Sequence, residues 1–204
     1  DFGKVLKASV AYGRAVEGNT NYSYKDALDN TLYADNTDAY IATLGYTTGV
    51  VNLDAAYYNF QDYYTIGAAP AVTPVDDLQI WTVGANAEIA KHVNLGAEYL
   101  KSDAKDTDGN DDGYVVTMNY KGASSADKGS YGLWAKYYDQ ASTTFVSHTT
   151  DADHSKLDGF KGYGVGFNYT LAKNIVGTVE YYDLDAKVGS ETTKTLWSDV
   201  TFSF

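Results

Sequence analysis

The feature that most constrains this chain is a strict two-residue alternation of apolar and polar side chains. In residues 196–204 one face is formed by Leu196, Val200, Phe202 and Phe204, while Asp, Thr and Ser dominate the other. Residues 162–171 alternate in the same way, with Gly, Asn and Thr opposite Tyr, Val, Phe and Leu. A period of two is typical of β-strands that present one apolar and one polar face, and helical periodicity is nearly absent.

Ten segments show this alternation, each about ten residues long, which is the length that a tilted strand needs to cross a bilayer. No stretch approaches the ~18 apolar residues of a membrane-spanning helix. The sequence therefore predicts an all-β fold, an antiparallel up-and-down transmembrane β-barrel that forms a single domain over residues 1–204. The expected strands are 4–16, 39–47, 50–60, 79–89, 93–101, 114–121, 130–139, 162–171, 174–184 and 196–204.

The connections between these segments alternate in length, which is typical of an up-and-down barrel with short periplasmic turns and long extracellular loops. Both chain ends are then expected at the short-turn end. Short connections are expected at 47–49, 90–92, 122–129 and 172–174, and long ones at 17–38, 61–78, 102–113, 140–159 and 185–194.

Tyrosines recur on the apolar faces in pairs six residues apart. Six residues cover about 20 Å along a strand, or about 15 Å of depth at a tilt near 40°. Amphipathic rings near both ends of a half-apolar strand are typical of the aromatic girdles of a membrane barrel. The predicted girdle consists of Tyr40, Tyr46, Tyr114, Tyr120, Tyr131, Tyr137, Tyr163 and Tyr169.

Composition narrows the function classes. The formal net charge is -12 and Arg14 is the only arginine, which disfavours a nucleic-acid partner because phosphate binding needs clustered basic residues. The chain has no cysteine, so thiolate metal sites and disulfides are excluded. No cofactor motif is present. Most acidic residues fall in the long connections, where divalent cations held by them would bridge to anionic lipopolysaccharide.

Two motifs carry a family resemblance. The stretch Tyr169-Thr-Leu-Ala-Lys-Asn174 resembles the late periplasmic turn of Gram-negative general porins, and Val200-Thr-Phe-Ser-Phe204 resembles their C-terminal strand. The acidic, Tyr-rich style is also similar to porins of S-layer-homology-anchored outer membranes. The resemblance implies location in the cell outer membrane, a homotrimer, and recognition of Phe202 and Phe204 by the outer-membrane assembly machinery. It also implies passive diffusion of small hydrophilic solutes and ions.

General porins are usually sixteen-stranded, whereas this chain supplies ten expected strands. The inward-folded third loop of these porins, with its Pro-Glu-Phe-Gly element, has no counterpart here. Either the ten strands close into a small barrel or they are the last part of a larger one. Many glycines are expected on the inward faces, where they would leave voids in a filled barrel. This favours a hydrated lumen and further strands.

The inward positions also carry charge. They include more acids than lysines, which predicts a mild preference for cations, although cross-strand pairing of these charges would account for them equally well. The predicted pore-lining charges are Lys7, Asp54, Glu88, Glu98, Lys136, Glu180 and Asp199.

Other readings remain open. Asp108, Asn110 and Asp112 follow the first half of an EF-hand calcium loop, but position twelve is Asn119, so an acidic hairpin loop is favoured over weak calcium binding. The cluster near His154 invites comparison with barrel hydrolases, although nothing holds its geometry. A soluble β-sandwich and a structural or adhesive ten-stranded barrel are the remaining alternatives. The sequence thus predicts a porin without catalytic activity.

Overall fold

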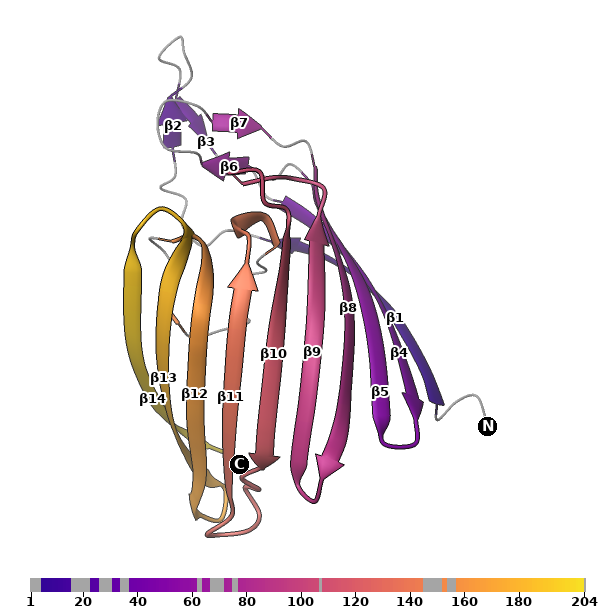
Figure 1. Ribbon diagram of the computed structural model, residues 1–204, viewed down its shortest axis with the longest axis vertical. Coiled ribbons are helices and arrows are strands. Elements are labelled where there is room, and N and C mark those ends of the chain that lie inside the picture. The colour runs from indigo at the N-terminus through magenta and orange to yellow at the C-terminus, as the bar shows by residue number, and fades with distance from the viewer. Residues whose placement is uncertain are drawn as a thin grey trace.

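A computed structural model describes residues 5–15, 23–25, 31–33, 37–61, 64–66, 72–74, 77–106, 108–144, 152–153 and 157–203. Ten strands form one antiparallel sheet in which each strand pairs with its neighbours along the chain, as the alternation predicted (Figure 1). The strands are β1 (Leu6–Ala15), β4 (Thr37–Thr48), β5 (Val51–Gln61), β8 (Asp77–Ala90), β9 (Val93–Ser102), β10 (Asp112–Lys121), β11 (Tyr131–Gln140), β12 (Asp158–Ala172), β13 (Ile175–Val188) and β14 (Thr192–Phe202).

Short turns and long connections lie at opposite ends of this sheet, as expected. Two small hairpins, which the alternation did not reveal, occupy the long-connection end (Figure 1). A single 3-10 turn, η1 (Ser142–Thr144), follows β11. No helix among the described residues is long and apolar enough to cross a membrane. The hairpins are formed by β2 (Ser23–Lys25) with β3 (Thr31–Tyr33), and by β6 (Tyr64–Ile66) with β7 (Val72–Pro74).

The long connection expected at 185–194 is wrong, because β13 and β14 continue through most of it. Only residues 189–191 lie between the two strands. The charged residues that suggested a loop instead pair across the strands. Lys194 forms an ion pair with Asp183 at 3.2 Å, and the Thr192 hydroxyl donates a hydrogen bond of 2.7 Å to Asp185.

The strands are staggered along the sheet, as they are in barrels. One row of paired residues begins at Tyr46, three residues before Gly49 in the first short turn, and crosses the sheet to Tyr163. Tyr163 lies ten residues before Lys173 in the last short turn. Such a shift of register is the shear that tilts strands relative to a barrel axis. The sheet curls (Figure 1). Its two edge strands are β1 and β14, and among the described residues these two strands do not pair with each other.

The outer face of the sheet, defined by the alternating apolar residues, is exposed along its whole width. Val10 is 86% exposed and Leu196 is 74% exposed, and large apolar side chains on every strand between them are exposed as well. Soluble monomers rarely expose a contiguous apolar surface of this extent. The outer face therefore requires a lipid phase or a partner to cover it. A soluble β-sandwich would instead leave a polar face toward water.

The inner face, on the other side of the sheet, is crowded where glycines were expected to leave voids. That expectation is wrong for β12. A Cβ atom at Gly166 would overlap the Trp134 indole, and one at Gly164 would lie 2.7 Å from the Tyr182 ring. The Trp134 indole of β11 packs directly against Gly164 and Gly166, so it fills the space that side chains at these two positions would occupy.

We predict that Gly166→Ala destabilises the sheet by about 1–3 kcal/mol, because the added methyl group overpacks against Trp134. Urea or thermal unfolding of the folded protein in detergent would measure this change. Gly13→Ala is the matched control, since a Cβ atom at Gly13 meets no atom of the described residues within 4 Å. Equal stability of the two variants would contradict the close packing of the Trp134 indole against Gly166.

Candidate functional site

The polar part of the inner face is centred on two carboxylates that flank a glycine. Asp54 of β5 and Glu98 of β9 are both paired in register with Gly84 of β8. A Cβ atom at Gly84 would lie 2.6 Å from the Asp54 carboxylate, so the missing side chain leaves room for that group. The Glu98 carboxylate interacts electrostatically with the Thr82 hydroxyl and with the charges of Asp54 and Lys136.

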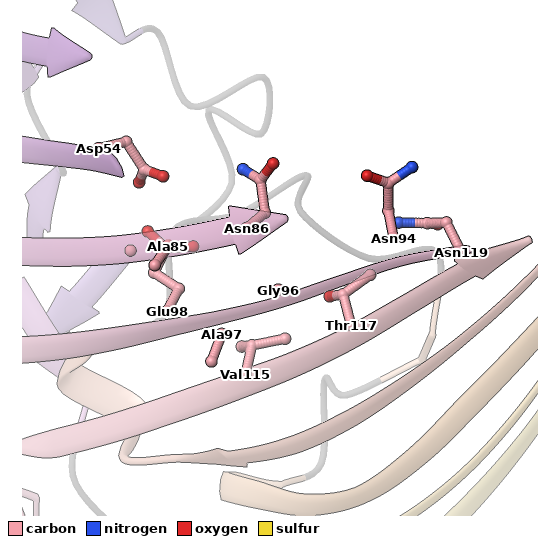
Figure 2. A pocket seen from close by; sticks show the side chains of 11 residues that line it. Asp54, Ala85, Asn86, Asn94, Gly96, Ala97, Glu98, Val115, Thr117 and Asn119 are labelled. Carbon is pink, nitrogen blue, oxygen red and sulfur yellow. The ribbon is translucent and has the colours of Figure 1, made fainter. Parts of the chain in front are cut away.

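These carboxylates border an open hollow of about 400 Å³ on β5, β8, β9 and β10. Figure 2 shows the side chains of Asp54, Asn86 and Asn94 projecting from the same side of the sheet. Thr117 and Asn119 of β10 complete its polar lining. Carboxylates, amides and hydroxyls in this arrangement offer oxygen atoms to water and cations.

A second hollow of about 820 Å³ adjoins the first and extends to β1. Asp54 and Glu98 line both hollows, and Lys7 lines the second. The Ser9 and Thr43 hydroxyls are hydrogen-bonded at 2.6 Å across β1 and β4. The structure thus brings three of the predicted pore-lining charges to one continuous polar surface.

A ladder of side-chain hydrogen bonds crosses this surface nearer the short turns. Thr47 donates to Asn52 at 2.8 Å, and the Asn52 amide donates to Asn86 at 2.9 Å. Cross-strand pairs of this kind stabilise a sheet while leaving polar atoms on its surface. The inner face of β4, β5 and β8 is therefore polar toward the short turns, whereas Leu78 and Ile80 on the inner face of β8 are buried toward the long connections.

The remaining predicted pore-lining charges are dispersed. The Lys136 ammonium lies 5.4 Å from the centre of the Trp134 ring. Glu88 lies at a short turn, where its carboxylate accepts a 2.9 Å hydrogen bond from the His92 amide. Glu180 is 9% exposed and accepts a 2.5 Å hydrogen bond from the Tyr182 hydroxyl, while Asp199 accepts one of 3.1 Å from Thr201.

The inner face of β11, β12 and β13 is apolar in the half nearer the long connections. Part of the β11–β12 connection covers it. The buried side chains of Tyr138, Phe160, Tyr182 and Leu184 form one cluster with Ala152 of that connection. Leu157 packs against the same cluster. Ala152 and Leu157 of this connection therefore lie on the inner face of the wall.

The covering segment reaches β14. The Asp153 amide donates a 3.0 Å hydrogen bond to the Thr195 hydroxyl on the inner face of that strand. At the other end of the segment Ala141, Thr143 and Thr144 are buried, and the Thr144 hydroxyl is hydrogen-bonded to the Ala141 carbonyl at 2.9 Å. The inner face is therefore divided into an open polar part and a covered apolar part.

The sequence does contain a signal for this cover. Tyr137 and Tyr138 are consecutive, as are Tyr181 and Tyr182. Because consecutive residues of a strand point to opposite faces, β11 and β13 carry an aromatic ring on both faces in the half nearer the long connections. Strands buried on both faces lose their alternation and become continuously apolar. This departure from strict alternation marks the region where a second layer lies on the inner face.

The predicted girdle tyrosines lie on the outer face, and their ring contacts join residues near the same end of the strands. Toward the long connections, Tyr114 and Tyr137 stack with ring centres 6.1 Å apart. Toward the short turns, Tyr120 and Tyr131 lie 6.3 Å apart, and Tyr131 also contacts Phe167. Six of the eight predicted girdle residues are exposed by 37–46%, namely Tyr40, Tyr46, Tyr114, Tyr137, Tyr163 and Tyr169.

At the C-terminal strand, Phe202 is 59% exposed on the outer face. Phe204, the other predicted assembly residue, lies outside the described residues. Lys121, at the end of β10, is turned toward the girdle. Its ammonium group lies 4.3 Å from the centre of the Tyr131 ring.

The calcium-like fragment is organised by a residue outside the motif. The Asp106 carboxylate accepts hydrogen bonds from the Asp108 amide at 3.0 Å and the Asn110 amide at 2.7 Å. The Asn110 side chain also donates to Asp106, while Asp112 begins β10. Among the described residues no group of three or more His, Asp or Glu side chains is placed to hold a metal ion. Of the expected hydrolase cluster, His154 lies outside the described residues.

Ion pairs mark the long-connection end of the outer face. Lys187 pairs with Asp139 at 2.7 Å, and Lys101 pairs with Asp111 at 2.6 Å. The hydrogen bond from the Lys101 ammonium holds the pKa of the Asp111 carboxyl below its usual value. The Lys101 side chain is exposed and that of Asp111 is partly exposed, so the pair contributes little to the free energy of unfolding.

Comparisons with known proteins add a structural likeness. No protein-family model and no curated protein match the chain. Among solved structures, the chain is similar to the copper transporter OprC, with 14% identical residues and a TM-score of 0.45. The aligned region covers 98% of this chain and 37% of that protein, so the chain spans well under half of its length. The fold described above rests on strand order and register alone.

We predict that Asp153→Cys combined with Thr195→Cys forms a disulfide on mild oxidation, because their hydrogen bond brings the two backbones close enough for one. The chain has no native cysteine, so the cross-link can be read directly as a gel shift. Asp153→Cys with Thr201→Cys is the control, since Thr201 lies near the opposite end of β14. Cross-linking of the control pair alone would contradict the position of the cover.

Proposed function

We propose that this sheet is the wall of an outer-membrane pore through which small hydrophilic solutes and ions diffuse passively, with a mild preference for cations. The observation that carries the proposal is the division of one sheet into two surfaces. The outer face is apolar, exposed and bordered by tyrosines, whereas the inner face presents Asp54 and Glu98 in open polar hollows. Transmembrane barrels with aqueous lumens combine these two surfaces.

The path of the solute follows the polar part of the inner face in this proposal. The hollows on β1 to β10 are open, while the segment with Ala152 covers the apolar wall of β11 to β13. Asp54 and Glu98 supply two negative charges on one row, and Lys7 and Lys136 partly offset them. A small excess of acid favours cations by its field rather than by forming a binding site.

A pore also requires the edges of the sheet to be closed, because unpaired backbone groups are costly in hydrocarbon. We favour additional strands that complete the wall beyond β1 and β14, as in the larger porins, over direct pairing of these two strands. The same proposal includes lipopolysaccharide and the outer-membrane assembly machinery as partners and a homotrimer as the assembly. It includes no catalytic step and no cofactor.

A structural or adhesive barrel is the second candidate, and the covered inner wall of β11 to β13 favours it. A barrel whose interior is filled needs no aqueous path, and small barrels are commonly filled by side chains. The two candidates differ in ion conduction. Reconstitution in planar bilayers should give large, steady current steps for a pore, and a folded protein that stays silent would contradict the pore.

We predict that Asp54→Asn with Glu98→Gln lowers the cation-to-anion permeability ratio by about twofold, since it removes two charges from the open part of the lumen. Reversal potentials across a salt gradient would measure the ratio. Lys136→Gln should shift it in the opposite direction. Asp185→Asn is the matched control, because it removes an acid from the outer face. An equal shift in this control would refute the assigned path.

A further inference from the structure

The short-turn end of the sheet carries lysines on three neighbouring turns. They are Lys91 between β8 and β9, Lys121 and Lys128 around the β10–β11 turn, and Lys173 between β12 and β13, and all four are exposed. Most acidic residues instead follow the long connections at the other end. The two ends of the sheet therefore differ in the sign of their charge.

Backbone hydrogen bonds join these turns into one continuous rim. The Lys121 amide donates to the His92 carbonyl at 2.8 Å, which connects the first turn to the second. The Asn174 amide donates to the Ser125 carbonyl at 2.6 Å, which connects the second to the third. The Ser203 amide donates to the Asn174 carbonyl at 2.9 Å and adds the end of β14. The lysines are thus held on a fixed framework.

The charges of this rim are not neutralised within the described part of the chain. None of its four lysines takes part in an ion pair there, whereas Lys101, Lys187 and Lys194 at the opposite end each pair with an aspartate. Two acidic residues lie near these lysines in the described part of the chain. Glu88 accepts a hydrogen bond from the His92 amide, and Asp127 is the one acid in the β10–β11 turn.

The rim also lies at a defined level relative to the aromatic girdle. The Lys121 ammonium is 5.3 Å from the centre of the Tyr120 ring and 4.3 Å from that of Tyr131, and it donates a 3.0 Å hydrogen bond to the Tyr131 hydroxyl. Girdle rings of membrane barrels lie at the boundary between hydrocarbon and headgroups. Lysine ammonium groups next to those rings, and just beyond them, fall at the level of the phosphates.

We propose that this lysine rim binds the phosphate groups of anionic phospholipid headgroups in the leaflet at the short-turn end. The inference rests on the membrane setting of the proposed function, but not on ion conduction. Lysines act here as point charges on a rigid backbone, so binding depends on the lipid's net charge and weakens with salt. The acidic opposite end excludes the same lipids, which fixes the orientation of the sheet relative to the charged leaflet.

The test compares a rim variant, Lys91→Gln, Lys121→Gln, Lys128→Gln and Lys173→Gln combined, with the unsubstituted protein. Both are folded in neutral detergent and titrated with phosphatidylglycerol or phosphatidylcholine, and retained lipid is counted by native mass spectrometry. We expect at least about tenfold weaker retention of phosphatidylglycerol by the rim variant, because the variant lacks four positive charges that attract the anionic headgroups. Retention of phosphatidylcholine should not change.

The matched control replaces four lysines at the other end, Lys101→Gln, Lys161→Gln, Lys187→Gln and Lys194→Gln, and should retain phosphatidylglycerol as the unsubstituted protein does. An equal loss in both variants would overturn the proposal, as would unchanged retention by the rim variant. The rim variant is also tested for binding to purified peptidoglycan. Loss of that binding with phosphatidylglycerol retention unchanged would also overturn the proposal. Current steps measured on the same samples keep the two proposals separate, since lipid retention does not depend on conduction.

Discussion

The ladder of backbone hydrogen bonds between antiparallel strands is the constraint on which the rest of this structure depends. It fixes the register, and the register decides which side chains become neighbours and on which face they lie. The pairing of Gly84 with both Asp54 and Glu98 follows from it, as does the position of Trp134 opposite Gly166. A slip of one residue would exchange the apolar and polar faces of a strand.

The inner face combines two kinds of surface that are usually separate. Toward the short turns of β1 to β10 it resembles the wall of an aqueous channel, with carboxylates, amides and hydroxyls around open hollows, although Leu78, Ile80 and Leu100 are buried nearer the long connections. On β11 to β13 it resembles the core of a soluble protein, with Leu184 fully buried and Tyr138 nearly so. The proposed solute path therefore follows one side of the sheet, and the other side supplies rigidity.

The sequence predicted the features that alternation determines, namely ten strands, their antiparallel order, the apolar outer face and most of the turns. It failed where side chains act across strands. Residues 185–194 were expected to form a long loop, but the hydrogen bond between Thr192 and Asp185 and the ion pair between Lys194 and Asp183 join the two strands in regular β-structure. The glycines of β12 suggested empty space because the ring that fills it comes from β11. Such contacts depend on register, which composition and periodicity do not specify.

The opposite charges of the two ends have an electrical consequence for a pore built on this sheet. One end of the sheet leads into connections that are acidic in sequence, and the other carries the lysines of the short turns. A cation entering from the acidic side is concentrated at the mouth before it meets the lumen, whereas one entering from the other side is first repelled. Current through such a pore rectifies, so its conductance depends on the polarity of the applied voltage.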